Sequence, residues 1–428
     1  MNSEIKQRIE KLNKGEIPDG YKKNEFGVFP CDWVTDNKLK DIGTFGKGRG
    51  IPGNKMQPEG VPCVGYGDIY MKYNHFHFEE AQSFVDEETA NDSQLIKKGT
   101  LLFTGTGETA DEIGKCVCYN GEADIYAGGD IITFITQEVD PLFVAYQQYQ
   151  SFSLKKKASF GQGHSVVHIQ KENLEKLNVA YPPSLQEQSR IAEILMKWDK
   201  AIELYNRQIE LLTQYKAVCL KKMFPSKGKN VPEWRFEGFT DAWEQRKLKE
   251  LAIFNPKAEI PEVFEYVDLE SVVGTEMLSH RTETKGTAPS RAQRVAQIGD
   301  LFFQTVRPYQ KNNYLFEMPD KYYVFSTGYA QMRPLVDGRF LLCLVQNEEF
   351  VQAVLDNCTG TSYPAISSND LAQIEVNSPQ NKQEQKQIGD FFKGIDRLIT
   401  LHQRKLETIQ HQRKVLQQYL LNGIVRVK

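Results

Sequence analysis

Two histidines and two cysteines come nearest to a metal site in this sequence. His164 and His168 are four residues apart, a spacing that on a helix places both rings on one face, as in zinc enzymes. They follow glycines and flank two valines, which favours a strand or turn instead. Cys116 and Cys118 form a single C-x-C with no second pair at ligand spacing. We therefore expect no metal, and cysteines that stay reduced.

Three further stretches approach catalytic patterns without completing them. GRGIPGNK (48–55) has asparagine where a phosphate-binding loop needs lysine. The sequence YPPS (181–184) is similar to the N/D-P-P-Y/F motif of amino-methyltransferases but lacks its polar first and aromatic last residues. Asp36 and Lys38 could belong to a nuclease acid-x-lysine motif, but no earlier acid stands at a suitable distance. We expect no catalytic residue and no cofactor of the chain's own.

Basic and polar side chains gather in loops, where they could contact nucleic acid. Between Arg281 and Lys311 there are six cations and two acids. Cations suit phosphates, and Arg, Gln, Ser and Thr suit base edges; a solvated surface is the alternative for any single charge. The candidate DNA-binding residues are Lys47, Arg49, Thr104, Thr106, Lys155, Lys156, Lys157, Gln162, His164, Ser165, Arg281, Lys285, Arg291, Arg294, Arg307, Tyr309, Lys311, Thr361, Ser362 and Tyr363.

An internal duplication shows which elements must position these loops. At an offset of 197, residues 163–224 align with residues 360–421 without a gap, and 16 of 62 positions are identical. The shared residues include a Q-E-Q triplet (186–188 and 383–385), a preceding proline and an upstream glycine and serine. Unrelated helices share apolar positions easily, but they do not readily share such a set. The sequence therefore predicts a repeated architecture.

The beginnings of the two halves also match. FGVFPCDW (26–33) and FEGFTDAW (236–243) both read F-x-x-F-x-x-x-W. Each is followed by a K-L-K-acid-apolar stretch, at 38–42 and 247–251, which we interpret as the start of a strand. The middles of the two halves diverge. We expect two globules that share a similar backbone fold and differ in the side chains that they expose.

Each Q-E-Q leads into a long helix with apolar residues spaced by four and three, as in a coiled coil. This seam is interrupted at one matched place, by Lys216 in one helix and Arg413 in the other. Neither helix can bury its seam alone, so we expect an antiparallel pair; the alternative is that each packs on its own globule. The seam residues are Ile191, Leu195, Trp198, Ile202, Tyr205, Ile209 and Leu212, then Ile388, Phe392, Ile395, Ile399, His402, Leu406 and Ile409.

The globules read as α+β, with short strands, a small curved sheet and a helix upon it. Strands are expected at 100–107, 129–136, 300–306 and 321–326, and helices at 141–159 and 339–357. We expect five segments: an N-terminal helical arm (1–29), a first globule (30–181), a central spacer helix (182–225), a second globule (226–378) and a C-terminal spacer helix (379–428).

Composition fits a globular protein of two or three domains, with 428 residues and 25% charged side chains. The net charge of −3 neither favours nor excludes nucleic acid, because binding depends on local patches. We expect no membrane span and no signal peptide, since no apolar run is long enough and the N-terminus is charged. The scattered cysteines favour a cytoplasmic location.

The duplicated segments resemble the specificity subunits of Type I restriction–modification enzymes. The resemblance covers essentially the whole chain and is carried by PPSLQEQSRIAEILMKWDKAIE (182–203), SPQNKQEQKQIGDFFKGIDRLI (378–399) and the junction at 221–248. It implies two target recognition domains that each read half of a bipartite double-stranded DNA target, and helices that set the gap between the half-sites.

The resemblance also implies protein partners. Two modification subunits would dock on the repeats and use S-adenosylmethionine to methylate adenine, and restriction subunits would use ATP and magnesium to cut DNA. The second helix departs from the first, with Lys393 and Gly394 where the first has Met196 and Lys197, so the two docking sites need not be equal. The alternatives are a coiled-coil adaptor that assembles proteins without reading DNA, and an enzyme with an unrecognised site.

Overall fold

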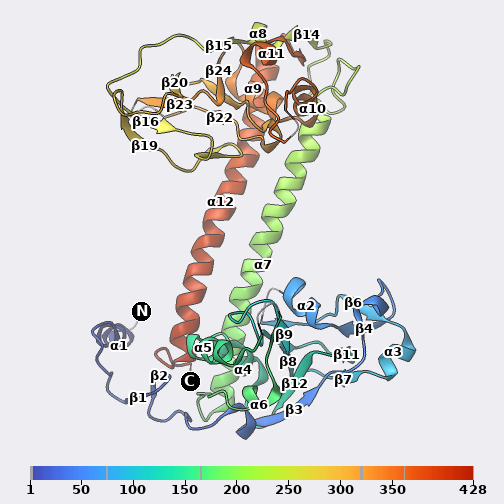
Figure 1. Cartoon of the computed structure of the whole chain (residues 1–428), viewed down its shortest axis with the longest axis vertical. Coiled ribbons are helices and arrows are strands. Elements are labelled where there is room, and N and C mark those ends of the chain that lie inside the picture. The colour runs from blue at the N-terminus through green and yellow to red at the C-terminus, as the bar shows by residue number, and fades with distance from the viewer. Residues whose placement is uncertain (1–2, 74–75, 164–165, 319–321, 361, 428) are drawn as a thin grey trace. The chain divides into compact units, whose positions relative to one another are not determined.

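The computed structural model describes residues 3–73, 76–163, 166–318, 322–360 and 362–427 (Figure 1). The chain divides into two compact units. Unit 1 comprises residues 1–204 and 406–428, and unit 2 comprises residues 205–405. Each unit therefore holds one α+β globule and parts of both long helices, as the duplication predicts. No helix in the described ranges is both long and apolar enough to cross a membrane.

The N-terminal segment is only partly the helical arm that we expected. Helix α1 (Ser3–Asn13) buries none of its residues, and it is followed by the hairpin of β1 (Tyr21–Asn24) and β2 (Gly27–Pro30). The hydroxyl of Tyr21 donates to the carbonyl of Gly423 at 2.7 Å. The N-terminal hairpin thus contacts the segment that follows α12, within unit 1.

Each globule contains two main sheets, where the sequence suggested one. In unit 1 a five-stranded sheet has the order β3 (Gly43–Lys47), β12 (Ile131–Thr136), β8 (Thr100–Thr104), β10 (Cys116–Tyr119) and β5 (His77–Phe78). A four-stranded sheet has the order β6 (Ser83–Val85), β4 (Val61–Val64), β11 (Ile125–Ala127) and β7 (Gln94–Ile96). Short helices α2 (Tyr66–Met71), α3 (Glu87–Asn91) and α6 (Lys171–Leu174) complete the globule.

Unit 2 repeats this two-sheet plan with four strands in each. One sheet has the order β15 (Ala252–Phe254), β24 (Tyr329–Pro334), β21 (Leu301–Gln304) and β22 (Tyr314–Leu315). The other has the order β19 (Arg281–Thr284), β16 (Val263–Val267), β23 (Tyr323–Ser326) and β20 (Ala292–Val295). Two small ladders pair β14 (Glu244–Lys247) with β25 (Glu375–Ser378), and β17 (Val272–Val273) with β18 (Glu276–Met277).

The K-L-K-acid stretches are helical turns and not the strand starts that we expected. They form the 3₁₀ turn Leu39–Asp41 in unit 1 and α8 (Leu248–Leu251) in unit 2. The acid of each stretch reaches back to a backbone N–H: Asp41 accepts from Lys38 at 2.8 Å and Glu250 from Lys247 at 3.2 Å. Such a side chain satisfies a donor that the first turn leaves open, so it favours the turn over a strand.

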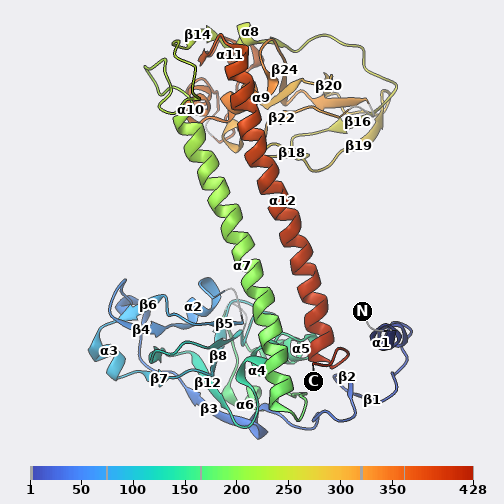
Figure 2. The ribbon, with the colours of Figure 1, turned by 180° about the vertical axis from the view of Figure 1, so that it is seen from behind.

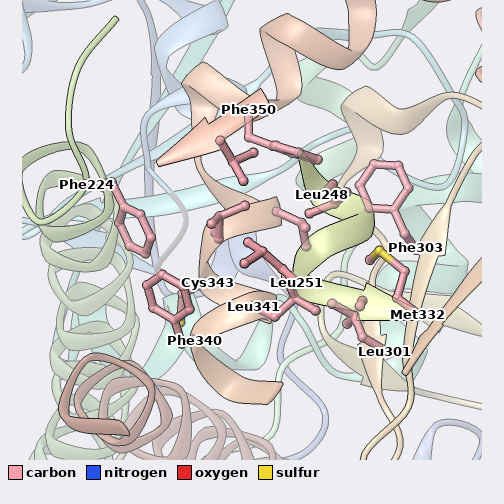
Figure 3. Packing of buried hydrophobic residues seen from close by; sticks show 14 of the residues in the cluster. Phe224, Leu248, Leu251, Leu301, Phe303, Met332, Phe340, Leu341, Cys343 and Phe350 are labelled. Atoms are coloured by element: carbon pink, nitrogen blue, oxygen red, sulfur yellow. The ribbon is translucent and has the colours of Figure 1, made fainter. Parts of the chain in front are cut away.

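The central strand of each globule is buried on both faces, which explains the second sheet. In β21, Leu301 and Phe303 pack under the helices of unit 2, as Figure 3 shows, while Phe302 packs into a separate core with Phe325. Strand β8 divides its side chains between two cores in the same way. A continuous apolar run is typical of a strand covered on both sides, and one sheet alone could not cover it.

The helical segment expected in each globule is a pair of helices. Unit 1 has α4 (Pro141–Gln147) and α5 (Ser151–Phe160), and unit 2 has α9 (Gly338–Gln346) and α10 (Glu348–Asp356). In unit 2 the break falls at Asn347, whose side chain accepts from the backbone N–H of Glu349 at 2.9 Å. A short α11 (Ser368–Gln373) follows. Asparagine favours such a cap over a helix interior because its side chain replaces a missing backbone partner.

The long helices are α7 (Leu185–Lys222) and α12 (Lys382–Leu421), and within each unit they run side by side (Figures 1 and 2). In unit 1, Ile191 and Leu195 share a core with Leu420 near the end of α12. In unit 2, Cys219 near the end of α7 shares a core with Ile388 at the beginning of α12. The pair is therefore antiparallel, as predicted. All fourteen predicted seam residues are buried or half-buried.

The Q-E-Q triplets fasten each long helix to its own globule. Gln188 accepts from the backbone N–H of Asp140 at 2.8 Å and donates to the carbonyl of Pro182 at 2.8 Å. In unit 2, Gln385 makes the same two bonds with Asp337 at 3.1 Å and Pro379 at 2.8 Å. The last glutamine of each triplet thus ties its helix to the N-terminus of α4 or α9. Both ways of packing considered from the sequence, against the other helix and against the globule, occur together.

The glutamate of each triplet accepts two hydrogen bonds from one arginine. Glu384 binds Arg235 at 2.7 and 2.9 Å, and Glu187 binds Arg426 at 2.6 and 2.8 Å. Both carboxylates are buried, so the paired hydrogen bonds offset the cost of removing their charge from water. The C-terminal tail of unit 1 therefore takes the place that the segment after α7 takes in unit 2.

Candidate nucleic-acid interface

In unit 1, two of the predicted loops are held against each other by backbone hydrogen bonds. Strand β8 ends at Thr104, and the carbonyl of Gly105 then accepts from the N–H of Ile169 at 3.0 Å. Next, β9 (Thr106–Gly107) pairs with β13 (Val167–His168). The glycine turn is closed by an antiparallel bridge between Gln162 and His168. We call residues 104–109, 161–163 and 166–169 the bracket of unit 1.

Unit 2 builds the same bracket from residues 304–311, 358–360 and 362–366. The carbonyl of Thr305 accepts from the N–H of Ile366 at 3.0 Å, and Val306 bridges Ala365. A second bridge, between Thr359 and Ala365, closes its glycine turn. Bonds at matching places, 197 to 200 residues apart, show that the repeat extends to the polar loops. The predicted loops of each globule are thus brought together in space.

Among the described residues of this bracket, Thr106, Gln162 and His168 carry polar side chains that are at least partly exposed. The hydroxyl of Thr106 lies 3.3 Å from Nδ1 of His168, and Gln162 is exposed. His168 lies in a strand, as its valine-flanked pattern predicted. The predicted sites His164 and Ser165 lie outside the described residues.

The bracket of unit 2 carries larger and more basic side chains. The guanidinium of Arg307 lies over the ring of Tyr363, 4.5 Å from its centroid. Tyr309 and Ser362 are exposed, and Lys311 forms an ion pair with Glu348. Thr361, also predicted as a site, lies outside the described residues. Equivalent backbones thus present different chemistry in the two units.

Two predicted contacts are wrong because their side chains are buried. Thr104 is fully buried, and its hydroxyl lies 2.8 Å from the hydroxyl of Tyr70. Lys157 is 1% exposed and donates to the carbonyl of Gly114 at 2.9 Å. Burial lowers the pKa of Lys157 to about 8, since the charged form loses its water. Neither side chain can reach a ligand at the surface.

The remaining candidates in unit 1 lie at the surface. Lys155 and Lys156 are exposed on α5, beside an open hollow of about 440 Å³. Lys47 ends β3 and Arg49 follows it, and both are exposed. Gly48 between them is tightly enclosed, since a Cβ there would lie 1.9 Å from the carbonyl oxygen of Gly128. The glycine therefore allows the two cations to flank a close backbone approach.

Several cations of unit 2 are already neutralised by acids. Arg281 binds Glu283 at 2.9 Å and Asp268 at 2.7 Å, and these hydrogen bonds raise the pKa of its guanidinium. Lys285 lies 3.7 Å from Glu262.

Two other cations of unit 2 differ from these in their surroundings. Arg294 is half-buried, and burial lowers its pKa. Arg291 is exposed. The six cations seen in the sequence are therefore not one uniform patch.

Tyr70 lies outside the bracket of unit 1 but supports it, and the sequence did not reveal it. Its hydroxyl donates to the carbonyl of Thr106 at 3.1 Å, and burial raises its pKa. Tyr70 lies in α2, within the stretch where the two halves diverge, so the internal alignment offered no counterpart that could single it out. Among the described residues, no group of three or more His, Cys, Asp or Glu side chains is placed to hold a metal ion.

Comparison with known proteins was made on both sequence and fold. A family profile described as the Type I restriction modification DNA specificity domain matches residues 30–214 and 284–411. The Type I restriction enzyme MjaVIII specificity subunit of Methanocaldococcus jannaschii is 28% identical over 84% of this chain and 86% of its own length. A putative type I restriction enzyme MjaX specificity subunit of the same organism is 26% identical over 96% of this chain and 97% of its own length.

Solved structures show a similar fold at lower sequence identity. The S subunit of a Type I restriction–modification system from M. genitalium has a TM-score of 0.60 at 15% identity, covering 93% of this chain and 97% of its own. A chain from a study of complex assembly and conformational transition in a type I system has a TM-score of 0.52 at 13% identity, covering 96% of this chain and 100% of its own.

Proposed function

Because the chain belongs to the family of Type I restriction–modification DNA specificity subunits, we propose that each of its units reads one half of a bipartite double-stranded DNA target. The chain itself is the non-catalytic part that selects the sequence. Methylation of adenine with S-adenosylmethionine, and cleavage driven by ATP and magnesium, would belong to partner subunits. The cytoplasmic location expected from the cysteines remains a prediction.

The repeated bracket is the observation that carries this proposal. Both units hold a strand end and a glycine turn together with the same backbone bonds. Upon this frame, unit 1 presents Gln162, Thr106 and His168, whereas unit 2 presents Arg307 and Tyr363. One backbone arrangement can read two different half-site sequences when its side chains differ, because base edges are distinguished by their hydrogen-bond donors and acceptors.

Exposed cations around the brackets supply phosphate contacts in this proposal. Lys155 and Lys156 in unit 1 and Arg291 in unit 2 are exposed. Such contacts fix the register of a protein on the duplex and weaken with salt, but they carry no sequence information. We assign sequence reading to the brackets and positioning to these cations.

We propose that the long helices dock the modification subunits. In unit 2, Leu211, Tyr215 and Leu398 are 46 to 49% exposed and line a shallow hollow of about 390 Å³ together with Gln208, Leu212 and His402. Contiguous apolar surface of this kind marks protein interaction sites. The alternative function, an adaptor that assembles proteins without reading DNA, rests on the same hollow.

A binding experiment separates these two functions. The full chain, in complex with its modification subunit, is titrated with a library of duplexes in gel-shift assays at fixed salt. We expect one bipartite sequence to bind at least about 1,000-fold more tightly than the rest. Equal affinity for every duplex, with intact assembly, would support the adaptor and reject the DNA-reading function.

A further inference from the structure

We propose that Arg307, held against Tyr363, recognises a guanine in the half-site read by unit 2. This inference rests on the proposed function and adds a specificity-determining residue and the base that it selects. Arginine can donate two parallel hydrogen bonds to O6 and N7 of guanine in the major groove, and no other base pair offers that arrangement there.

Arg307 differs from Arg281, Lys285 and Lys311 of its unit because no acid neutralises its charge among the described residues. Within the described ranges its guanidinium makes neither an ion pair nor a hydrogen bond, whereas Arg281, Lys285 and Lys311 each face an acid. Its only side-chain partner there is the ring face of Tyr363, 4.5 Å away. A ring face orients a guanidinium and leaves its five N–H donors at the edge free. The donors are therefore available to a base.

The loop that carries Arg307 is braced from within. The side chain of Gln304 donates to the carbonyl of Val306 at 2.6 Å and to the side chain of Gln310 at 2.8 Å. The carbonyl of Lys311 accepts from the side chain of Gln346 on α9 at 2.9 Å. A base-reading side chain needs such support, because recognition at a base edge tolerates little displacement.

The backbone of Arg307 is held in an unusual conformation that aims its side chain. Its φ is +53°, and that of Lys311 is +56°, a region that costs a non-glycine residue about 1 kcal/mol or more. The N–H of Arg307 donates to the carbonyl of Pro364 at 2.8 Å. That bond joins the loop to the turn that carries Tyr363. The surrounding bracket thus enforces the conformation and keeps the stacked pair together.

Unit 1 has no arginine at the equivalent position. Counted from the matching strands, Arg307 corresponds to Gly107, and Tyr363 corresponds to Val166. A Cβ at Gly107 would lie 2.8 Å from the hydroxyl of Tyr70, closer than real contacts. The arginine–tyrosine pair is therefore specific to unit 2, and only one of the two half-sites should depend on it.

The test uses the full chain expressed with its modification subunit, and the readout is single-molecule sequencing of methylated adenines. We expect the unaltered chain to give a bipartite motif with an invariant G·C pair in one half. Arg307→Ala should make that pair degenerate, lowering discrimination there roughly 5- to 100-fold, and leave the other half unchanged. Arg307→Lys should also relax it, because lysine has no planar fork.

Control variants make the result decisive. Tyr363→Phe keeps the ring face and should preserve the motif, whereas Tyr363→Ala should relax the same base pair as Arg307→Ala. Lys249→Ala removes an exposed cation of α8 that is not among the candidate DNA-binding residues and should change nothing. A uniform loss of methylation at all sites in Arg307→Ala would mean a phosphate contact and overturn the proposal, as would an unchanged motif. Methylation without any motif by the unaltered chain would instead reject the proposed function.

Discussion

The side chain of Arg413 donates to the carboxylate of Asp199 at 2.8 Å, at the place where the apolar seam of the long helices is interrupted. The repeat provides an equivalent salt bridge in unit 2, where Lys216 donates to Asp396 at 2.5 Å. Asp199 and Asp396 are equivalent in the duplication, as are Lys216 and Arg413. The matched interruption of the seam is therefore a pair of salt bridges between antiparallel helices.

The two salt bridges should differ in strength because they differ in burial. Asp199 and Arg413 are almost fully buried, and Asp199 also accepts from the hydroxyl of Tyr146 at 2.7 Å. Asp199→Asn leaves an uncompensated buried guanidinium and should destabilise unit 1 by roughly 3–5 kcal/mol. Lys216→Ala removes a pair whose side chains are 21% and 34% exposed and should cost about 1 kcal/mol or less.

Amide hydrogen exchange along α7 and α12 measures these costs segment by segment. The double variant Asp199→Leu with Arg413→Leu is the control, since removing both charges together should recover much of the loss. Equal and small losses of unfolding free energy in Asp199→Asn and Lys216→Ala would contradict the expectation that the more buried salt bridge contributes more.

Lys157 predicts a pH dependence of stability. Its pKa falls to about 8 in the folded chain, below about 10.4 when unfolded. Between these values the unfolded chain binds more protons, so stability rises with pH across that window and is lowest below about pH 8. Lys157→Met removes this titration. Relative to the variant, the original chain should gain about 2–3 kcal/mol of unfolding free energy between pH 7.5 and 10.5.

Urea unfolding of both chains at several pH values tests this. Lys156→Met is the matched control, because Lys156 is the exposed neighbour and should leave the profile unchanged. A difference in unfolding free energy between Lys157→Met and the original chain that stays constant across this pH window would show that Lys157 does not titrate as its burial requires.

The internal repeat explains how much could be predicted from the sequence. The seam and the glycine turns recur in two copies, so each copy supports the other, and both are found in the structure. Lys157 lies outside the aligned residues 163–224, although the same offset of 197 pairs it with Val354, which is fully buried. Its charge alone indicated a surface contact.

The features that could not be predicted from the sequence depend on contacts between residues far apart in the chain. The side chain of Thr104 is held by the hydroxyl of Tyr70 of α2, 34 residues away in the chain, and no local pattern indicates that contact. Arg281 is neutralised by Asp268, 13 residues away, on a neighbouring segment. The availability of Arg307 follows from the ring of Tyr363, 56 positions further on. Partners at such separations are set by the fold.

Gln148 should be replaceable with a gain in stability. It is fully buried, and neither amide atom has a hydrogen-bond partner in the part of the chain that the structure describes. Its counterpart in unit 2 is Val345. Gln148→Leu removes two unpaired polar atoms at similar volume and should raise the unfolding free energy of unit 1 by about 1–2 kcal/mol, as measured by urea unfolding.

The adjacent Gln147 is the matched control. It is equally buried, but its amide bonds both the carbonyl and the N–H of Ala180. Gln147→Leu should therefore destabilise by about 2 kcal/mol or more, although its counterpart in unit 2 is Leu344. A loss of stability in both variants would mean that Gln148 has a partner after all.

The apolar hollow on the helices of unit 2 predicts an unequal docking of two modification subunits. Leu211 and Tyr215 line it, whereas their counterparts in the repeat are Thr408 and Gln412. Leu211→Ser with Tyr215→Ser should weaken one docking site by roughly 10-fold or more, since each side chain contributes on the order of 1 kcal/mol when covered. Mass photometry at a fixed concentration should then show complexes with one modification subunit, whereas we expect the original chain to hold two.

Ile253→Ser is the control for this double variant. Ile253 is 49% exposed on β15 of the same unit and lies outside the hollow, so its loss should leave two subunits bound. Circular dichroism of each variant verifies that the helices remain formed. Retention of both subunits by Leu211→Ser with Tyr215→Ser would place the docking surface elsewhere on the chain, because exposed apolar side chains buried by a partner cannot be replaced by serine without loss of affinity.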